Sequence, residues 1–394
     1  MTGDATPRDA TAPSPAAAPR DATARSPAAA PRDATAPSPA AAPRDATGPS
    51  PAGAAAPSPA AAPRDATGPS PAGAAAPSPT DATAPTPGPA PRDATVPPPR
   101  VAVLGAGVMG RNIARVFLRA GAEVALYSRT EATLGSARAA LADEAVERLR
   151  TPRELDAAVA DATLVIESVP ERIELKRQLL AAAEAAMPES GLLATNTSSL
   201  PLDDLAAVLC RPERFLGLHW FNPAHLVPLV EVVPASGTDP ACLDAAVATL
   251  EAAGKRPLRL GRALPGFVAN RLQYALIREA LHLLEDGVVD AAGLDLVLTE
   301  CLGLRWAVIG PMRSSDLAGL ETAIAVAREL FPQLANATEP GPALLEPAAA
   351  GRLGVRTGAG FHDYPDAARA EAERDAGLAA VLAALQSQKP SERR

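Results

Sequence analysis

Large apolar side chains are distributed unevenly along this chain of 394 residues. The first 99 residues contain no Leu, Ile, Phe, Tyr or Trp, whereas from Val101 onward apolar positions recur with the spacing of strands and helices. A segment without large apolar side chains cannot bury enough surface to offset the entropy that folding costs. We therefore predict a disordered tail over residues 1–99 and a folded part that starts at Arg100.

The tail is built from a repeated unit. The first copy, residues 8–19, has the sequence RDATAPSPAAAP, and further copies begin at Arg20, Arg32, Arg44 and Arg64. Pro, Ala and Ser at this density favour an extended chain, and no unit has an apolar face that could stack on its neighbour. Three interpretations stay open: a solvated linker, a Pro-rich arm that binds a partner, and a stretch upstream of the true start codon.

The apolar pattern after residue 100 predicts the start of a dinucleotide-binding fold. Residues 101–104 suit a buried parallel strand, a helix runs to about residue 120, and residues 123–127 form a second strand. A GxGxxG motif lies between the first strand and the helix. The candidate cofactor-binding residues in it are Gly105, Gly107, Val108, Met109 and Gly110. Such glycines let the main chain approach a pyrophosphate at the helix N-terminus, so the motif predicts a nicotinamide dinucleotide site.

The end of the second strand bears on the choice of cofactor. An acidic residue there would bind the ribose hydroxyls of NAD, but Ser128 occupies this place and Arg129 follows. A carboxylate repels a 2′-phosphate, whereas a hydroxyl and a guanidinium suit one. The pair favours NADP(H); the alternative is two ordinary loop residues beside an NAD site.

Composition and charge exclude several classes of protein. Of the 43 prolines, 25 precede residue 100, and the 295 residues that follow the tail can hold one large or two modest domains. A net charge of −8 without a basic block gives no sign of nucleic-acid binding. There is no apolar run of membrane-spanning length, no secretory signal, and no metal or disulfide spacing among three Cys and four His. We expect a cytoplasmic protein that acts on a small molecule, without metal, membrane or nucleic acid.

Three later segments carry candidate chemistry. Residues 195–199 follow an apolar strand, residues 215–218 form a strand that continues into HWFNP, and residues 229–233 place Glu231 within an apolar strand. A buried Glu is costly unless it is paired, and His219, twelve residues earlier, is the expected partner. A His held by a carboxylate is a tuned base. The alternative is a pair that only links two strands.

These motifs, in this order, resemble the L-3-hydroxyacyl-CoA dehydrogenase family. The resemblance covers nearly everything from Arg100 to Tyr364, and the C-terminal half resembles the lambda-crystallin and L-gulonate 3-dehydrogenase branch. Beside the glycine motif, it rests on VPE (169–171), NTSS (196–199), HWFNP (219–223), PLVEVV (228–233), PGFVANR (265–271) and RTGAGFHDY (356–364).

The resemblance implies a role for each matching residue. His219 would be the general base, oriented by Glu231, while Ser198 and Asn270 would hydrogen-bond the substrate oxygen. The cofactor side would be lined by Glu171, Lys176, Asn196 and Asn222. Each also has a structural interpretation: Ser198 as a helix cap, Asn270 as an ordinary residue of a helix N-terminus, and Lys176 as a solvated helix residue.

The resemblance also implies an α/β fold and an activity. A Rossmann-type domain (100–263) would precede an all-α domain (264–370), through which the family dimerises, and a C-terminal helix and tail (371–394). The protein would interconvert an L-3-hydroxyacyl substrate and its 3-oxo form with NAD(P). NTSS and HWFNP favour a CoA thioester as the substrate, and a free 3-hydroxy acid is the alternative.

Two features of the sequence depart from the family pattern, and two other classes of protein compete with this interpretation. The acidic residue that would select NAD is missing, and the segment between Ser128 and Glu171 is short for the helical arm that holds CoA. We predict one helix there, from Glu131 to about Leu149, and a second short one. The glycine motif also looks similar to enzymes of the 6-phosphogluconate and 3-hydroxyisobutyrate type, which use a catalytic Lys in a helix of the next domain, but the corresponding helix here carries Asn270 and no Lys. A non-catalytic crystallin-like or interaction protein would not require the complete set of candidate residues.

Overall fold

The computed structural model of the chain describes residues 99–387. The predicted tail, apart from Pro99, lies outside the described residues, as do residues 388–394. The predictions made for these two segments therefore stay predictions.

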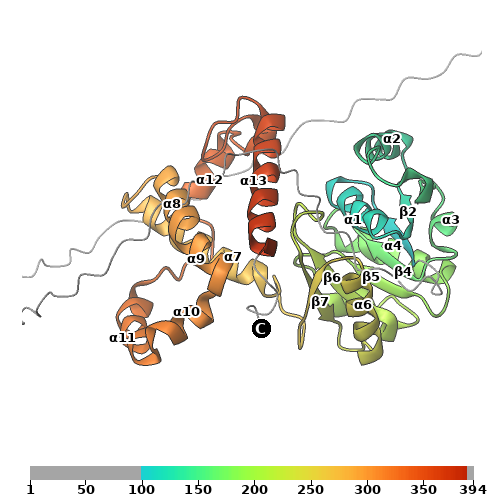
Figure 1. Ribbon diagram of the computed structural model, residues 1–394, viewed down its shortest axis with the longest axis horizontal. Coiled ribbons are helices and arrows are strands. Elements are labelled where there is room, and N and C mark those ends of the chain that lie inside the picture. Colours follow the sequence, from blue (N-terminus) through green and yellow to red (C-terminus); the bar gives the residue numbers. More distant parts are fainter. Residues whose placement is uncertain (1–98, 388–394) are drawn as a thin grey trace, which may run out of the picture. The chain divides into compact units, whose positions relative to one another are not determined.

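An eight-stranded sheet organises the first part of the described chain (Figure 1). Its spatial order is β3-β2-β1-β4-β5-β6-β7-β8. The first six strands are parallel, β7 is antiparallel to β6, and β8 is parallel to β7. The carboxyl ends of the six parallel strands therefore share one edge, which is where sheets of this kind bind ligands. The strands are β1 (Arg100–Leu104), β2 (Glu123–Tyr127), β3 (Leu149–Arg150), β4 (Leu164–Glu167), β5 (Leu192–Thr195), β6 (Phe215–Trp220), β7 (Leu229–Pro234) and β8 (Arg256–Arg259).

Helices cover both faces of this sheet because its strands are apolar on both sides. In β1, Val101 and Val103 pack into a cluster with α1, α2 and α6, while Ala102 and Leu104 pack into a second cluster with α3, α4 and α5. These helices are α1 (Val108–Arg119), α2 (Glu131–Ala140), α3 (Leu155–Val159), α4 (Ile173–Ala186), α5 (Leu202–Ala206) and α6 (Pro240–Ala252). Short 3-10 turns are η1 (Val146–Arg148) and η2 (Pro212–Arg214).

The helix predicted to run to about Leu149 is wrong at its C-terminal end. α2 ends at Ala140, and Leu149 begins strand β3. Between them, Glu144 forms ion pairs with Arg115 at 2.9 Å and with Arg119 at 2.7 Å, both on α1. These tertiary contacts fold the segment back onto α1, which an uninterrupted helix could not do.

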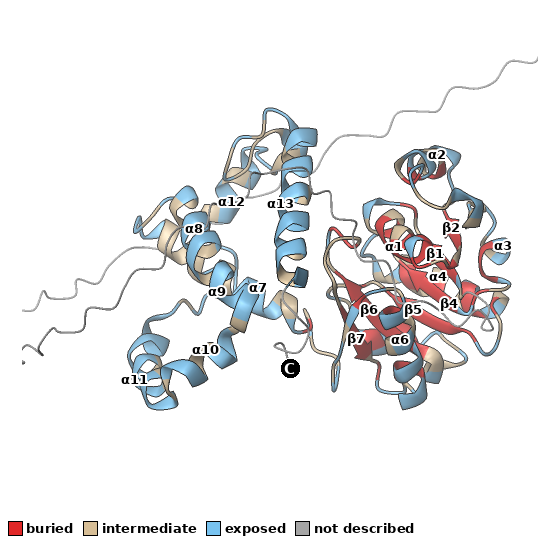
Figure 2. Cartoon of the chain, viewed as in Figure 1, coloured by how far each residue is buried: buried red, intermediate tan, exposed pale blue. Residues whose placement is uncertain are grey.

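From Ala269 the described chain is helical except for turns. No residue of these helices is buried within the part that the structure describes, and Figure 2 colours them as exposed or intermediate. Apolar side chains such as Leu272 (65% exposed) and Leu317 (73% exposed) are accessible to solvent. The helices are α7 (Ala269–Glu285), α8 (Ala291–Val297), α9 (Leu304–Ile309), α10 (Pro311–Ala318), α11 (Leu320–Leu330), α12 (Pro342–Ala349) and α13 (Ala367–Ser387), with a π-helical segment η3 (Leu298–Gly303) and the short 3-10 turns η4 (Phe331–Gln333) and η5 (Val355–Thr357).

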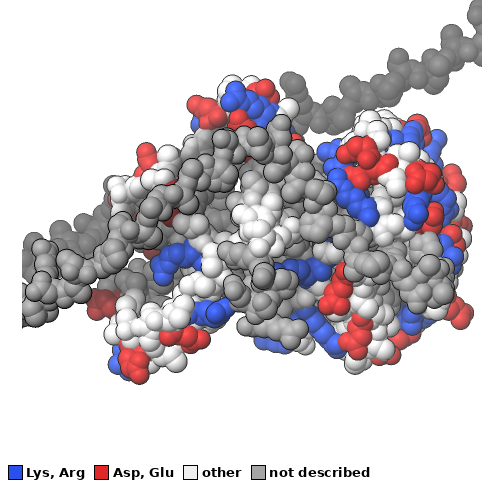
Figure 3. Space-filling model, viewed as in Figure 1, with Lys and Arg blue, Asp and Glu red and all other residues white. Residues whose placement is uncertain are grey.

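The α/β fold with a helical C-terminal part is confirmed. On the face drawn in Figure 3, basic and acidic side chains lie interspersed over the described surface. No helix between residues 99 and 387 is both long and apolar enough to cross a membrane.

Candidate active site

The glycine motif joins β1 to α1 at the carboxyl edge of the sheet. A Cβ on Gly105, whose φ is +117°, would lie 2.5 Å from the carbonyl oxygen of Ser168, and a Cβ on Gly110 would lie 1.7 Å from that of Gly105. Gly107 differs, because a Cβ there would meet no described atom within 4 Å, and no described side chain caps α1. The open side of Gly107 and the free N–H groups of α1 fit a dinucleotide pyrophosphate. The two other members of the motif begin α1: Val108 and Met109.

The carboxyl end of β2 lies beside this loop. The backbone N–H of Gly105 donates to the carbonyl oxygen of Tyr127 at 2.9 Å. Ser128 comes next, with its hydroxyl oxygen 3.4 Å from the N–H of Thr130, and the side chain of Arg129 is exposed. The structure thus places the predicted ribose-binding position next to the predicted pyrophosphate loop.

The structure brings His219 and Glu231 together at the antiparallel pair of β6 and β7. The two residues are direct partners in the strand register, and Nδ1 of His219 lies 2.7 Å from Oε2 of Glu231. His219 is 3% exposed and Glu231 is fully buried. The other carboxylate oxygen of Glu231 accepts hydrogen bonds from the backbone N–H groups of Val268 (3.0 Å) and Ala269 (2.9 Å).

These hydrogen bonds determine the charge of the pair and its tautomer. Burial acts to raise the pKa of Glu231, but the hydrogen bond from His219 and those from the two backbone N–H groups outweigh it, and the pKa lies below its ordinary value. An ionised carboxylate only accepts, so Nδ1 of His219 carries a proton, and in the neutral imidazole the lone pair is then at Nε2. The arrangement can therefore provide a base at Nε2.

Asn270 lies at the second position of α7, directly after Ala269. Because the N–H of Ala269 donates to Glu231, the first turn of α7 is tied to the carboxylate that holds His219. The rings of Phe221 and Phe267 flank His219, with centroids 4.5 Å and 5.4 Å from that of the imidazole. Asn270 thus follows directly on a segment bonded to the His219–Glu231 pair, although its position also matches the structural interpretation.

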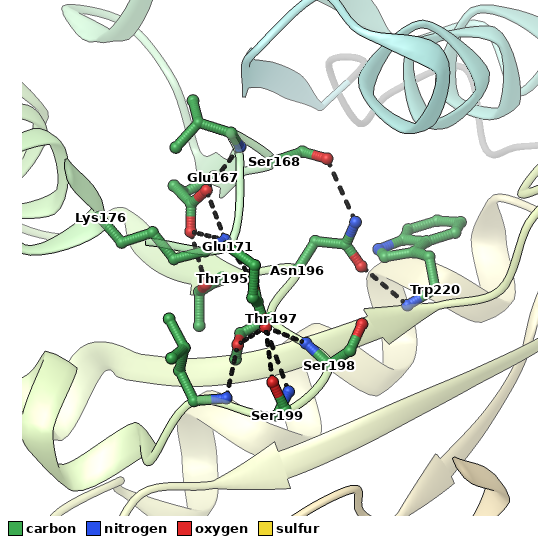
Figure 4. A network of polar contacts seen from close by, with 12 residues as sticks. Glu167, Ser168, Glu171, Lys176, Thr195, Asn196, Thr197, Ser198, Ser199 and Trp220 are labelled. Carbon is green, nitrogen blue, oxygen red and sulfur yellow. Dashed lines mark hydrogen bonds and ion pairs between the residues drawn. The ribbon is translucent and has the colours of Figure 1, made fainter. Parts of the chain in front are cut away.

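Ser198 lies in a loop that one carboxylate organises (Figure 4). Oε1 of Glu171 accepts hydrogen bonds from the hydroxyl of Thr197 (2.5 Å) and from the backbone N–H groups of Ser198 (2.8 Å) and Ser199 (3.1 Å). Burial acts to raise the pKa of Glu171, yet the Thr197 hydrogen bond and the charge of Lys176 leave it lowered. The cap interpretation of Ser198 is wrong, because the N-cap of α5 is Pro201 and no side chain caps that helix within the described chain.

Lys176 is fully buried, so its interpretation as a solvated helix residue is wrong. Its ammonium lies 2.8 Å and 2.9 Å from the two carboxylate oxygens of Glu167 and 3.2 Å from Oε2 of Glu171 (Figure 4). Glu167 is also fully buried and accepts from the hydroxyl of Thr195 at 2.6 Å. In this arrangement Lys176 contacts the loop through Glu171, and a direct contact with the cofactor stays a prediction.

Asn196 connects three neighbouring strand ends. Its amide nitrogen donates to the hydroxyl of Ser168 after β4 (3.1 Å), and its amide oxygen accepts from the backbone N–H of Trp220 on β6 (3.0 Å). Asn222, two residues further along, is exposed. Asn196 therefore aligns the segment that carries His219 with the NTSS loop.

Several residues of this network were not predicted from the sequence: Glu167, Ser168, Thr195 and Thr197. Glu167 could have been found by the rule that identified Glu231, because it ends an apolar strand (LVIE) and needs a buried partner. Thr195 carries no such signal, since Thr in a strand is common, and Thr197 lies in the loop after β5, where no buried charge calls for a partner.

A doubly covered parallel sheet, a glycine loop open to a pyrophosphate and a buried His–Glu pair define a dinucleotide-dependent oxidoreductase. The family model "3-hydroxyacyl-CoA dehydrogenase, NAD binding domain" matches residues 100–263, and "3-hydroxyacyl-CoA dehydrogenase, C-terminal domain" matches residues 266–364. The chain belongs to the 3-hydroxyacyl-CoA dehydrogenase family. It is a dehydrogenase that acts on CH–OH groups with a nicotinamide dinucleotide.

Relatives and solved structures agree with this assignment. L-Carnitine dehydrogenase of Streptomyces coelicolor is 39% identical over 310 residues, which cover 74% of this chain and 96% of that protein. The lambda-crystallin homolog of Bos taurus is 37% identical over 235 residues, 55% of this chain and 73% of that protein. The structure of 5-formyl-3-hydroxy-2-methylpyridine 4-carboxylic acid 5-dehydrogenase, described as an NAD+ dependent dismutase, has a TM-score of 0.71 and 32% identity, covering 74% of this chain and all of that one. The predicted family and branch are confirmed.

Proposed function

We propose that this protein interconverts an L-3-hydroxy substrate and its 3-oxo form, with His219 as the general base. The buried His219–Glu231 pair carries this proposal. Glu231 engages Nδ1 of His219, so the lone pair of the neutral imidazole is at Nε2. In the oxidative direction Nε2 takes the hydroxyl proton, and the ionised Glu231 stabilises the imidazolium that forms. A bound nicotinamide dinucleotide supplies the hydride acceptor.

Ser198 and Asn270 would hold the substrate oxygen near His219. Two contacts support this role for Ser198: its loop is bound by Glu171, and Asn196 joins that loop to β6. For Asn270, the support is the bond between its neighbour Ala269 and Glu231. Positioning of this kind is worth most when the supporting groups are themselves rigid.

Our proposal for the substrate class weighs the sequence motifs against the segment after β2. The NTSS and HWFNP motifs favour a CoA thioester, as does the family assignment. α2 ends at Ala140, so the helical arm that would hold CoA is even shorter than predicted. Two similar proteins, a carnitine dehydrogenase and a pyridine carboxylic acid dehydrogenase, are also named for substrates without CoA. Of the two candidates, we therefore favour a free 3-hydroxy acid.

For the cofactor we propose NADP(H), on the ground that Ser128 and Arg129 stand where NAD-dependent enzymes carry a carboxylate. The test is a matrix of NADH and NADPH against acetoacetyl-CoA and a series of free 3-oxo acids, followed by absorbance of the reduced nicotinamide. We expect turnover of 3-oxo acids with NADPH and weaker turnover with NADH.

Each outcome of the matrix bears on a different part of the proposal. Turnover of acetoacetyl-CoA but of no free acid would reverse the choice of substrate class, and a preference for NADH would contradict the Ser128–Arg129 argument. No hydride transfer with any 3-oxo or 3-hydroxy compound and either cofactor would refute the proposed reaction.

The same assay on protein lacking residues 1–98 should give unchanged kinetics if the tail is separate from the enzyme.

The C-terminal helices support a homodimer. Side chains such as Leu272, Tyr274 and Phe331 are between 65% and 72% exposed, and exposed apolar surface of this kind usually marks an interface. Similarity to a family that dimerises through this domain makes a second copy of the chain the expected partner. Light scattering on the purified protein should give a mass of about 80 kDa, twice the 40.0 kDa of one chain, and a stable 40 kDa species would contradict the proposal.

A further inference from the structure

A second arginine lies beside the predicted ribose-binding loop. Arg153, in the segment between β3 and α3, places Nη2 3.5 Å from the backbone carbonyl oxygen of Arg129. The two residues are 24 positions apart in the chain, so only the fold brings them together. The guanidinium of Arg153 therefore reaches the same loop as Ser128 and Arg129.

The charges of these two arginines are available to a ligand. Both side chains are exposed, and within residues 99–387 neither forms an ion pair. Their neighbours differ: Arg138 pairs with Glu131, the acidic residue at the start of α2, and Arg150 pairs with Asp161 at 2.8 Å. Glu131 and Asp161 are thus each paired with an arginine other than Arg129 and Arg153.

The loop also offers donors without a negative charge. The hydroxyl oxygen of Ser128 accepts only a long contact from the N–H of Thr130, which leaves its own hydrogen free to donate. The side chain of Thr130 makes no cap bond to α2, since its hydroxyl pairs with that of Thr133 at 2.8 Å. The loop therefore presents a hydroxyl and two guanidinium groups, which can donate hydrogen bonds to phosphate oxygens.

We propose that Ser128, Arg129 and Arg153 form a cradle for a phosphomonoester, the 2′-phosphate of NADP(H), and that Arg153 is a specificity-determining residue. The cradle rests on the proposed function, because it presumes that the adenosine half of the dinucleotide lies beside β2. Two unpaired guanidinium groups match the charge of a phosphate dianion. Arg153 reaches this site from the segment before α3, which the proposed function did not include.

The test compares two ligands that differ only in the 2′-phosphate: adenosine 2′,5′-bisphosphate and adenosine 5′-monophosphate. Isothermal titration calorimetry on the full chain measures their affinities without any turnover. We expect the bisphosphate to bind at least about tenfold more tightly, the value of one charge-assisted hydrogen bond. Arg153→Gln should reduce that preference about tenfold and leave the monophosphate unchanged, and Arg129→Gln should act in the same direction.

Arg150→Gln is the matched control, because Arg150 lies three residues before Arg153, at the end of β3, but is paired with Asp161; the preference should not change. Equal affinity of the wild type for both ligands would overturn the cradle and leave the proposed dehydrogenase standing. An Arg153→Gln variant that loses affinity for both ligands equally, or for neither, would remove Arg153 from the cradle. Absence of binding by both nucleotides would overturn the cradle together with the dinucleotide site itself.

Discussion

Replacing His219 with Gln should lower kcat by about 10²–10⁴-fold, the contribution of a positioned acid–base group. Gln can still donate to the buried Oε2 of Glu231, so the carboxylate keeps a partner and the variant should fold. It has no lone pair of suitable basicity where Nε2 stood, so the hydroxyl proton has no acceptor. Steady-state rates from the absorbance of the reduced nicotinamide would measure the loss.

A structural role for His219 makes a different prediction. If the imidazole only links β6 to β7, His219→Gln would lower the melting temperature and leave kcat within a fewfold of the wild type. His282→Gln is the control, because His282 lies on α7, its side chain is 41% exposed, and its one ion pair within residues 99–387 is with Asp286 at 3.7 Å. Dinucleotide affinity should be unchanged in both variants, so that a lost rate in His219→Gln reports on chemistry.

The sheet could be predicted where short apolar runs are bounded by Gly or Pro. Residues 101–104, 123–127 and 229–233 were predicted as strands, and all three lie in the sheet. The His219–Glu231 contact followed from the cost of a buried carboxylate, which requires a partner on an adjacent strand. Such arguments work because they depend on local composition and on one strong energetic demand.

The remaining features depend on contacts between distant segments. α2 ends at Ala140 because Glu144 pairs with α1, and strand β3, two residues long, exists only because β2 offers it an edge. The bonds from the N–H groups of Val268 and Ala269 to Glu231 could not be predicted, because every residue but proline has such a donor. The pairing of Glu167 could have been predicted, since a buried carboxylate needs a partner there as at Glu231, and Lys176 is that partner.

Lysine is rare in this chain, so the lysine that pairs with Glu167 is informative about the space at that position. The chain has only three lysines among 37 basic residues, and the two within the described residues, Lys176 and Lys255, are both buried. Lys255 donates to the carbonyl oxygens of Ala224 (2.6 Å) and Val227 (3.0 Å), and burial lowers its pKa to about 8. A compact ammonium fits these enclosed positions, whereas a planar guanidinium needs more room.

Replacing Glu231 with Gln should be as damaging as replacing His219, although the side chain keeps its shape. The N–H groups of Val268 and Ala269 both point at Oε1, so the amide oxygen must face them and the amide nitrogen must face His219. That nitrogen donates to Nδ1 and forces the imidazole proton onto Nε2, which is then no longer a base. The wrong tautomer costs about 10⁴-fold in kcat in a comparable His–carboxylate pair, and we expect a loss of about 10³–10⁴-fold here.

The same variant tests the ionisation of Glu231 through stability. The pKa of Glu231 is lowered in the folded protein, so its charge stabilises the fold at pH values above the ordinary pKa of 4.5. That stabilisation is lost as the pH falls through the pKa of the folded state. The free energy of unfolding of the wild type, measured in urea relative to Glu231→Gln, should thus be constant near pH 7 and fall below pH 4.5. Glu251→Gln, at an exposed position of α6, should show neither effect. A Glu231→Gln enzyme with wild-type kcat would show that the carboxylate does not hold the tautomer of His219, and a pH-independent difference in stability would show that it is not ionised in the folded state.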